Sequence, residues 1–120
     1  IVRAALESIA FQIEDVLEDL KLENLCPAEL HVDGKPTENQ FLMEFQAGIS
    51  DTVIIKNRIE EASAYGTALM AGLATAYWGL SDIPALVRSG AVISPAMSCE
   101  TRENLRKGWK KAIRMSMLKE

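Results

Sequence analysis

One turn in the sequence combines residue types that can bind a ligand. Val32, Asp33 and Gly34 end a short alternating segment, and Thr37 and Asn39 follow within five residues. In open parallel sheets ligands bind beyond the carboxyl ends of the strands, where a glycine lets the backbone approach closely. A helix that starts here offers unpaired backbone N–H groups, and Asn39 can both donate and accept hydrogen bonds. The turn is therefore the candidate binding site, although an Asp-Gly turn before a capped helix is also a common, purely structural arrangement.

No complete catalytic motif accompanies this turn. His31, the only histidine, shares a strand face with Asp33 and has no nearby nucleophile or ligand cluster, so we interpret it as structural. The sequence contains no P-loop, no Gly-x-Ser-x-Gly elbow and no His-Glu-x-x-His motif. An acidic run could form a metal cluster, but it fits a solvated helix face better; it comprises Glu14, Asp15, Glu18 and Asp19. We therefore predict no metal site and no self-contained catalytic site in this chain.

The composition describes one ordinary folded domain. The chain has 120 residues, of which 48% are hydrophobic and 25% are charged, and this excludes a collagen-like or low-complexity chain. Its net charge of −4 gives no reason to expect nucleic acid as a partner. Cys26 and Cys99 lie far apart without a CxxC spacing. We therefore expect neither a disulfide scaffold nor a cysteine zinc site, and we expect a reducing, cytoplasmic location.

The start of the chain is already amphipathic. The first residues, IVRAALESIA, contain no Met, and no basic stretch is followed by an apolar run and a small-residue cleavage site. This pattern is not that of a secretory signal. We interpret the chain as a piece of a longer polypeptide that begins just before or within a helix.

Periodicity predicts alternating helices and strands in the first half. Residues 2–20 predict an amphipathic helix, and its apolar stripe consists of Val2, Leu6, Ile9, Ile13, Val16, Leu17 and Leu20. Residues 29–33 alternate and predict a short strand that ends at Gly34. Thr37 and Gln40 have the spacing of a capping box, which predicts a helix start there. The β-branched run at residues 52–55 predicts a second, buried strand.

The second half predicts three helices. Residues 62–81 carry no charge, but Ala, Gly, Ser and Thr dominate the run, so it favours a buried core helix over a membrane span. Its small residues predict close approach by another element; they are Gly66, Ala68, Ala71 and Gly72. Ser81 and Asp82 can cap a short helix that continues to Val87 and ends at Gly90.

A last helix is predicted from about Thr101, and it carries both an apolar side and a cluster of cations. The apolar side consists of Leu105, Trp109, Ala112 and Ile113, and the cations are Arg102, Arg106, Lys107, Lys110, Lys111 and Arg114. These cations could lie on an anionic membrane or grip phosphate. Because the whole chain is acidic, we favour an exposed helix end whose cations offset the acidic first helix.

The order of the elements indicates an α/β fold. A strand, a helix and a strand of these lengths imply parallel pairing with a right-handed crossover. Two strands alone make a poor sheet, which again suggests that the chain continues a larger α/β sheet.

Three segments resemble the glycerol kinases of the FGGY carbohydrate kinase family. Val32-Asp33-Gly34 followed by NQFLMEFQA at residues 39–47 resembles the family's VDGG…NNFLMQFQAD segment. EASAYGTALMAGLATAYW at residues 61–78 resembles ETTALGAAYLAGLAVGFW, and GWKKA at residues 108–112 resembles the family's closing motif. The opening ALESIAFQIEDVL also fits the family's helix before the glycine turn. The likeness covers nearly the whole chain in the correct order.

This resemblance implies the carboxyl-terminal part of an ATP-dependent kinase. The implied fold is a helix-rich part of an actin-like, ribonuclease-H-like lobe with parallel strands and packed helices, and residues 1–120 are a carboxyl-terminal fragment of the second, nucleotide-side domain. The family positions that contact the nucleotide fall on Gly34, Lys35 and Asn39. The resemblance also implies ATP with Mg as cofactor, glycerol or a related polyol as acceptor, and a possible homo-oligomer. The catalytic aspartate, the glycerol contacts and the magnesium ligands belong upstream, so no catalytic residue is assigned here.

Departures from the family pattern leave alternatives open. Lys35 replaces the second glycine, Gln40 replaces the second Asn, and Gly48 stands where the family has Asp. A degenerate module with a packing or subunit-contact role, or a kinase for another sugar or polyol, is therefore also considered. Phosphoryl transfer requires positioning between two lobes, so we expect this chain alone to be inactive.

Overall fold

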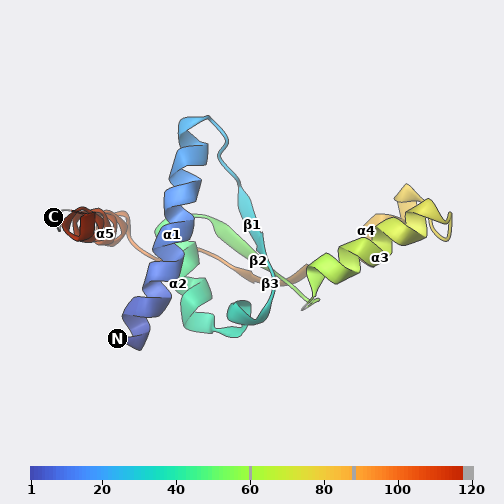
Figure 1. Cartoon of the computed structure of the whole chain (residues 1–120), viewed down its shortest axis with the longest axis horizontal. Helices are drawn as coiled ribbons and strands as arrows, with labels where there is room; N and C mark the ends of the chain where they lie inside the picture. Colours follow the sequence, from blue (N-terminus) through green and yellow to red (C-terminus); the bar gives the residue numbers. More distant parts are fainter. Residues whose placement is uncertain (60, 88, 118–120) are drawn as a thin grey trace.

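The computed structural model describes residues 1–59, 61–87 and 89–117, and consists of helices around a small sheet (Figure 1). The helices are α1 (Val2–Leu22), α2 (Gln40–Ser50), α3 (Ala62–Ala74), α4 (Ile83–Leu86) and α5 (Cys99–Met117). The strands are β1 (Glu29–Val32), β2 (Val53–Asn57) and β3 (Ser89–Ile93), and two 3₁₀ turns are η1 (Lys35–Glu38) and η2 (Leu80–Asp82). The helix-rich α/β prediction is confirmed.

The sheet is mixed and has the order β1-β2-β3. The pair β1 and β2 is parallel, as predicted, with Glu29 opposite Val53 and Val32 opposite Lys56. Strand β3 was not predicted; it runs antiparallel to β2, with Ile54 opposite Ile93. Gly90 was expected to end a helix, and that was wrong, because it lies within β3. A Cβ at Gly90 would come 2.3 Å from the Lys56 carbonyl oxygen, so glycine lets the two strands approach.

The core lies between α1, α2 and the sheet. Its buried members are Ala10, Phe11, Leu42, Met43, Phe45, Ala47, Ile49 and Ile54. The Phe11 ring packs edge-on against Phe45, with 5.5 Å between centroids, and stacks on Trp109 at 5.1 Å. Leu105 and Trp109 pack against this core, which confirms that these two residues lie on the apolar side of α5. Helix α5 begins at Cys99, slightly before the predicted start.

Helix α1 turns a different face to the core from the predicted one. Of the expected stripe, Leu17 is buried, but Val2, Ile9, Ile13, Val16 and Leu20 are exposed. The buried positions are instead Ala10, Phe11, Glu14 and Leu17. The prediction failed because a second face of α1 makes the long-range contacts. On that face Phe11 packs against Phe45 and Trp109, and Glu14 pairs with Arg106.

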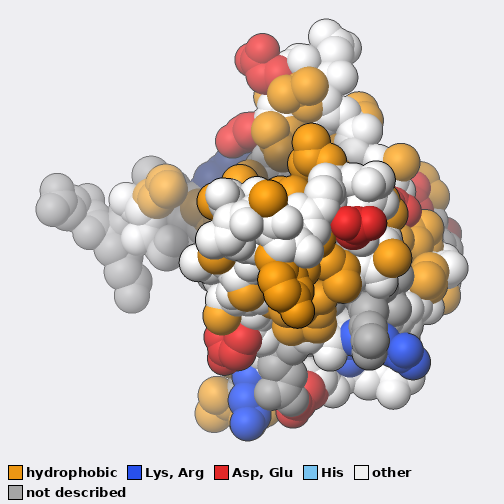
Figure 2. Space-filling model, turned by 90° about the vertical axis from the view of Figure 1, so that its right-hand side faces the viewer, with side chains coloured by type: hydrophobic (Ala, Val, Ile, Leu, Met, Phe, Trp, Pro, Cys, Tyr) orange, Lys and Arg blue, Asp and Glu red, His pale blue; other side chains and the backbone are white. Residues whose placement is uncertain are grey.

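Helix α3 extends away from the sheet as part of an arm with α4, and it was wrongly predicted to be a core helix (Figure 1). Gly72 is its only buried residue in the described part of the chain. Figure 2, which looks at the end of the arm, shows hydrophobic side chains gathered there. They line an open groove of about 510 Å³ that includes Leu69, Met70 and Leu80. The predicted close approach is confirmed at Gly72 and not at Gly66, where a Cβ would meet nothing within 4 Å.

The close approach at Gly72 comes from Trp78, which folds back over α3. The indole Nε1 donates to the Leu69 carbonyl at 2.9 Å, and a Cβ at Gly72 would lie 2.1 Å from a ring atom of Trp78. The Trp78 indole can therefore occupy this position only because residue 72 is glycine and has no side chain.

Gly72→Ala is expected to displace Trp78 and to lower the free energy of unfolding by about 1–2 kcal/mol, because overpacking outweighs alanine's better helix propensity. Gly66→Ala in the same helix is the control and should raise that free energy by up to about 1 kcal/mol. Urea titration followed by tryptophan fluorescence measures both. Equal stability of the two variants would contradict the packing argument.

No helix among the described residues is long and apolar enough to cross a membrane.

Candidate functional site

The candidate site is the turn between β1 and α2. Strand β1 ends at Val32, and the chain passes through Asp33 and Gly34 into the 3₁₀ turn η1 before α2 begins at Gln40. Gly34 has φ 84° and ψ 169°, a conformation that side chains disfavour. The turn therefore requires glycine at this position, as the sequence predicted from the Asp-Gly pair.

Thr37 closes this turn. Its backbone N–H and its Oγ1 hydroxyl both donate to the Gly34 carbonyl, at 3.0 and 2.8 Å. The Thr37 side chain is buried, and Pro36 restricts the backbone at the start of η1. The buried Thr37 thus stabilises the turn from its inner side, and the exposed residues of the turn are not needed for these hydrogen bonds.

The predicted capping box of Thr37 and Gln40 was wrong. The N-cap of α2 is Asn39, whose Oδ1 accepts the Leu42 N–H at 3.0 Å. Gln40 lies inside the helix, where its Nε2 donates to Glu44 at 2.7 Å. The 3₁₀ turn consumes the residues that would otherwise have started the helix, so the cap falls two positions after Thr37.

Asn39 retains hydrogen-bonding capacity beyond the cap. Its side chain is exposed, and within the described chain its Nδ2 group donates to no other residue. Similarly, the turn's own hydrogen bonds use the N–H groups of Thr37 and Asn39 but not that of Lys35. Two donors, one from the backbone and one from a side chain, are therefore available at the carboxyl end of β1.

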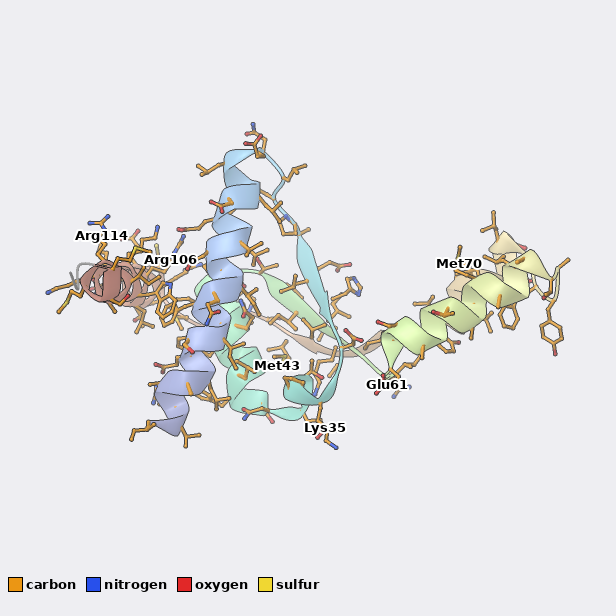
Figure 3. The ribbon with its side chains drawn as sticks, in the orientation of Figure 1. Lys35, Met43, Glu61, Met70, Arg106 and Arg114 are labelled. Carbon is orange, nitrogen blue, oxygen red and sulfur yellow. The ribbon has the colours of Figure 1, made fainter. Side chains whose placement is uncertain are left out.

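Lys35 is exposed and follows Gly34 directly (Figure 3). Its ammonium group makes no ion pair with any described residue. The only non-glycine residues with positive φ in the described ranges are Asn24, Asp51 and Ala76. Lys35 therefore occupies an ordinary conformation and does not distort the turn.

The other predicted candidates lie apart from the turn or have different roles. His31 is exposed and pairs with Glu29 at 2.9 Å. Cys26 and Cys99 are unpaired and exposed. In the described part of the chain no group of three or more His, Cys, Asp or Glu residues could hold a metal ion.

The acidic run on α1 is not a solvated face, which corrects the sequence interpretation. Glu14 is only 2% exposed, and its Oε1 lies 3.2 Å from the Lys21 ammonium and 3.3 Å from the Arg106 guanidinium. Glu18 pairs with Arg106 and Lys110. The sequence analysis expected the cations of the last helix to offset the acidic first helix, and the pairs of Arg106 and Lys110 with α1 agree with that expectation. The burial of Glu14 was not predicted.

Substitutions at Asn39 can separate its two hydrogen-bonding groups. Asn39→Ala removes the cap, and we expect it to lower the free energy of unfolding by about 1 kcal/mol. Asn39→Asp keeps an acceptor for the Leu42 N–H and should retain most of that stability, although it removes the Nδ2 donors. Urea denaturation followed by circular dichroism tests this. An aspartate variant as unstable as the alanine variant would show that the cap is not the source of the effect.

Comparison with known proteins shows that this chain is similar to sugar and polyol kinases. Residues 1–75 match the FGGY family of carbohydrate kinases, C-terminal domain. Glycerol kinase of Thermococcus onnurineus is 44% identical over 117 residues, which are 96% of this chain and 23% of that protein. Glycerol kinase of Haemophilus influenzae is 44% identical over 119 residues, which are 98% of this chain and 24% of that protein. The chain thus spans about a quarter of the length of the curated relatives it matches.

Solved structures give the same picture of the fold. The crystal structure of Plasmodium falciparum glycerol kinase with ADP superposes with a TM-score of 0.86 at 31% identity, over 100% of this chain and 24% of that one. The ligand-bound xylulose kinase of Lactobacillus acidophilus gives 0.79 at 19% identity, over 98% of this chain and 24% of that one, and supports the fold alone.

Proposed function

This chain belongs to the FGGY family of carbohydrate kinases, C-terminal domain, and from that premise we propose that it is the nucleotide-side part of an ATP-dependent kinase. The full polypeptide would transfer the terminal phosphoryl group of ATP to glycerol, giving glycerol 3-phosphate. The relatives named as glycerol kinases support this choice of acceptor. Residues 1–120 would be a carboxyl-terminal fragment of the kinase's second domain.

The observation that carries the proposal is the turn at the carboxyl end of β1. Gly34 adopts positive φ there, so the backbone is bare where a ligand can approach closely. The Lys35 N–H and the Asn39 Nδ2 are the donors that the turn does not use itself. Gly34, Lys35 and Asn39 would then bind ATP and the product ADP by hydrogen bonds, which position the nucleotide without taking part in bond making.

Magnesium and the phosphoryl acceptor would be held by residues beyond this chain. Bound Mg²⁺ neutralises charge on the nucleotide phosphates during phosphoryl transfer. Among the described residues no group of three or more His, Cys, Asp or Glu could hold a metal ion, and no step is assigned to the metal here. Because the polyol site is also assigned elsewhere, the chain alone should form no glycerol 3-phosphate, whereas the full polypeptide should. We further propose that the full polypeptide is a cytoplasmic, homo-oligomeric enzyme without nucleic-acid or membrane partners.

The direct test is titration of ADP into the isotope-labelled chain, followed by amide chemical shifts. We expect the largest shifts at Gly34, Lys35 and Asn39, with α5 amides as an internal control. If the folded chain shows no shift at the turn, the same titration is made on the full polypeptide. Failure of both to bind ADP would contradict the proposal and favour the degenerate module.

Lys35 and Gln40 are the observations that favour that second function, a module with a packing or subunit-contact role. The turn itself argues against structural damage, because Lys35 is exposed at ordinary φ and Gln40 pairs with Glu44. A lysine here can reach a phosphate or crowd the base.

We expect Lys35 to reach a phosphate of the nucleotide, because its side chain is exposed and has no ion-pair partner in the described chain. Lys35→Gly should then weaken ADP binding roughly two- to fivefold, with the loss shrinking at high salt. Calorimetric titration measures this. Tighter binding by the glycine variant would mean that the lysine crowds the nucleotide, and an unchanged affinity would favour the packing role.

A further inference from the structure

Helix α5 lies beside α1 and presents one polar face to it. Four residues on that face follow helical spacing, namely Arg102, Arg106, Trp109 and Lys110, and each bonds to an acidic group outside α5. Figure 3 shows Arg106 toward α1 and Arg114 at the far side of α5. The cations of α5 therefore differ in their surroundings: Arg102, Arg106 and Lys110 pair with acidic groups outside the helix, whereas Arg114 lies on the opposite side.

The acceptors come from two helices. The Arg102 guanidinium lies 2.5 Å from Asp51, the C-cap residue that follows α2. The Trp109 Nε1 donates to Asp15 at 2.8 Å, and the Lys110 ammonium lies 2.8 Å from Glu18. Arg106 contacts both Glu18 and Glu14 on successive turns of α1.

Glu14 is the buried centre of this network. One carboxylate oxygen, Oε1, is shared by Lys21 and Arg106, and the other, Oε2, is buried without a hydrogen-bond partner in the described chain. A buried carboxylate is costly unless cations and hydrogen bonds compensate it. Glu14 has two cationic partners, and docking of α5 supplies one of them, Arg106. Loss of Arg106 should therefore destabilise the docked helix more than loss of an exposed lysine.

The apolar contacts that dock α5 come from few of its residues. No described residue of this helix is fully buried, and only Leu105 and Trp109 pack against the core cluster. Between α1 and α5 lies a groove of about 360 Å³, lined by Phe11, Gly108 and Ala112 among others. A second groove of about 470 Å³ lies on the charged side, where Glu18, Arg106 and Lys110 are among its lining residues. The interface is thus hollow on both sides, and the ion pairs bridge it.

We propose that α5 is a detachable strap, docked on α1 by charge, with the pair of Glu14 and Arg106 selecting its position. Opening of the strap uncovers the Phe11 ring and frees Asp51 while α1, α2 and the sheet stay folded. This inference rests on the fold and does not depend on nucleotide binding.

Trp109 reports directly on the strap. In a Trp78→Phe background it is the only tryptophan, because the chain contains two. Arg106→Gln removes the α5 cation at Glu14. Lys107→Gln is the matched control, because the only ion pair of Lys107 within the described residues is with Glu103 of its own helix, at 3.9 Å. Acrylamide quenching of Trp109 and hydrogen exchange of α2 and α5 amides are the two readouts.

We expect Arg106→Gln to raise the quenching constant of Trp109 roughly twofold or more and to lower protection in α5 at least about tenfold, with α2 unchanged. Glu14→Gln should act in the same direction but less strongly, because the pair of Arg106 and Glu18 remains. The effect of the double variant should be smaller than the sum of the two single effects, since both changes remove the contact between Glu14 and Arg106. Lys107→Gln should match the parent. The proposal is overturned if Lys107→Gln and Arg106→Gln act alike, if Arg106→Gln leaves Trp109 unchanged, or if α2 loses protection together with α5.

Discussion

Gly34→Val is expected to abolish the ADP-induced shifts at the turn, to weaken ADP binding at least about tenfold, and to lower the free energy of unfolding by about 1–3 kcal/mol. Gly34 has φ 84°, and a β-branched residue is strongly disfavoured there. Valine would therefore push the backbone into another conformation and break the two hydrogen bonds from Thr37 to the Gly34 carbonyl. Calorimetric titration with ADP and urea denaturation measure the two effects.

The matched control is valine at the next position. Lys35 is exposed and has ordinary φ, so Lys35→Val should change stability by no more than about 0.5 kcal/mol. It removes the ammonium group with the distal part of the aliphatic stem and keeps the backbone N–H, so any loss of ADP affinity should be no greater than that of Lys35→Gly. If Gly34→Val bound ADP as tightly as the parent, the nucleotide would not depend on this turn, and the assignment of Gly34, Lys35 and Asn39 would fail.

The candidate site was predictable from the sequence because its determinants are local. An Asp-Gly pair at the end of an alternating segment specifies the turn, and Asn39 is a favoured N-cap residue. The choice of Thr37 as cap was wrong because the spacing to Gln40 gives no sign of an intervening 3₁₀ turn. Thr37 instead bonds back to Gly34. The predicted turn is present with Asn39 as the N-cap in place of Thr37, and nucleotide binding by Gly34, Lys35 and Asn39 stays a prediction.

The orientation of α1 was not predictable, because its partners are distant in the sequence. Trp109 and Asp15 are 94 positions apart, and Glu14 meets Arg106 across a similar separation. From α1 alone, Ile9, Ile13 and Val16 form a better apolar stripe than the face that contains Glu14. Pairing with the basic face of α5 reverses that preference, because it compensates the buried carboxylate.

The arm shows a different limit. Residues of α3 are small or apolar all around the helix, so no stripe indicates which side is covered. A uniformly apolar helix predicts burial, yet in this chain Met70 and the nearby Leu80 are exposed. Gly72 was nevertheless placed correctly as a site of close approach, because glycine near the end of a helix is a local signal.

Gly90→Ala is expected to lower the free energy of unfolding by about 3 kcal/mol, the largest loss that we predict for a single added methyl group. The added Cβ would lie 2.3 Å from the Lys56 carbonyl oxygen and 3.2 Å from its carbon. Lys56 belongs to β2, which pairs with both other strands, so its backbone has little freedom to move. Urea denaturation followed by circular dichroism measures the loss.

Gly108→Ala is the control for this substitution, because the same methyl group is added where nothing lies within 4 Å. In the exposed part of α5 it should raise the free energy of unfolding by up to about 1 kcal/mol. The contrast isolates strand packing from the general effect of replacing glycine. Hydrogen exchange locates the damage: Gly90→Ala should lower protection in β2 and β3 first, since the strand pairs on either side of it are Asn57 with Ser89 and Ile55 with Val92. If Gly90→Ala were as stable as the parent, β3 would be able to shift away from β2, and the antiparallel pair would not be a fixed part of this fold.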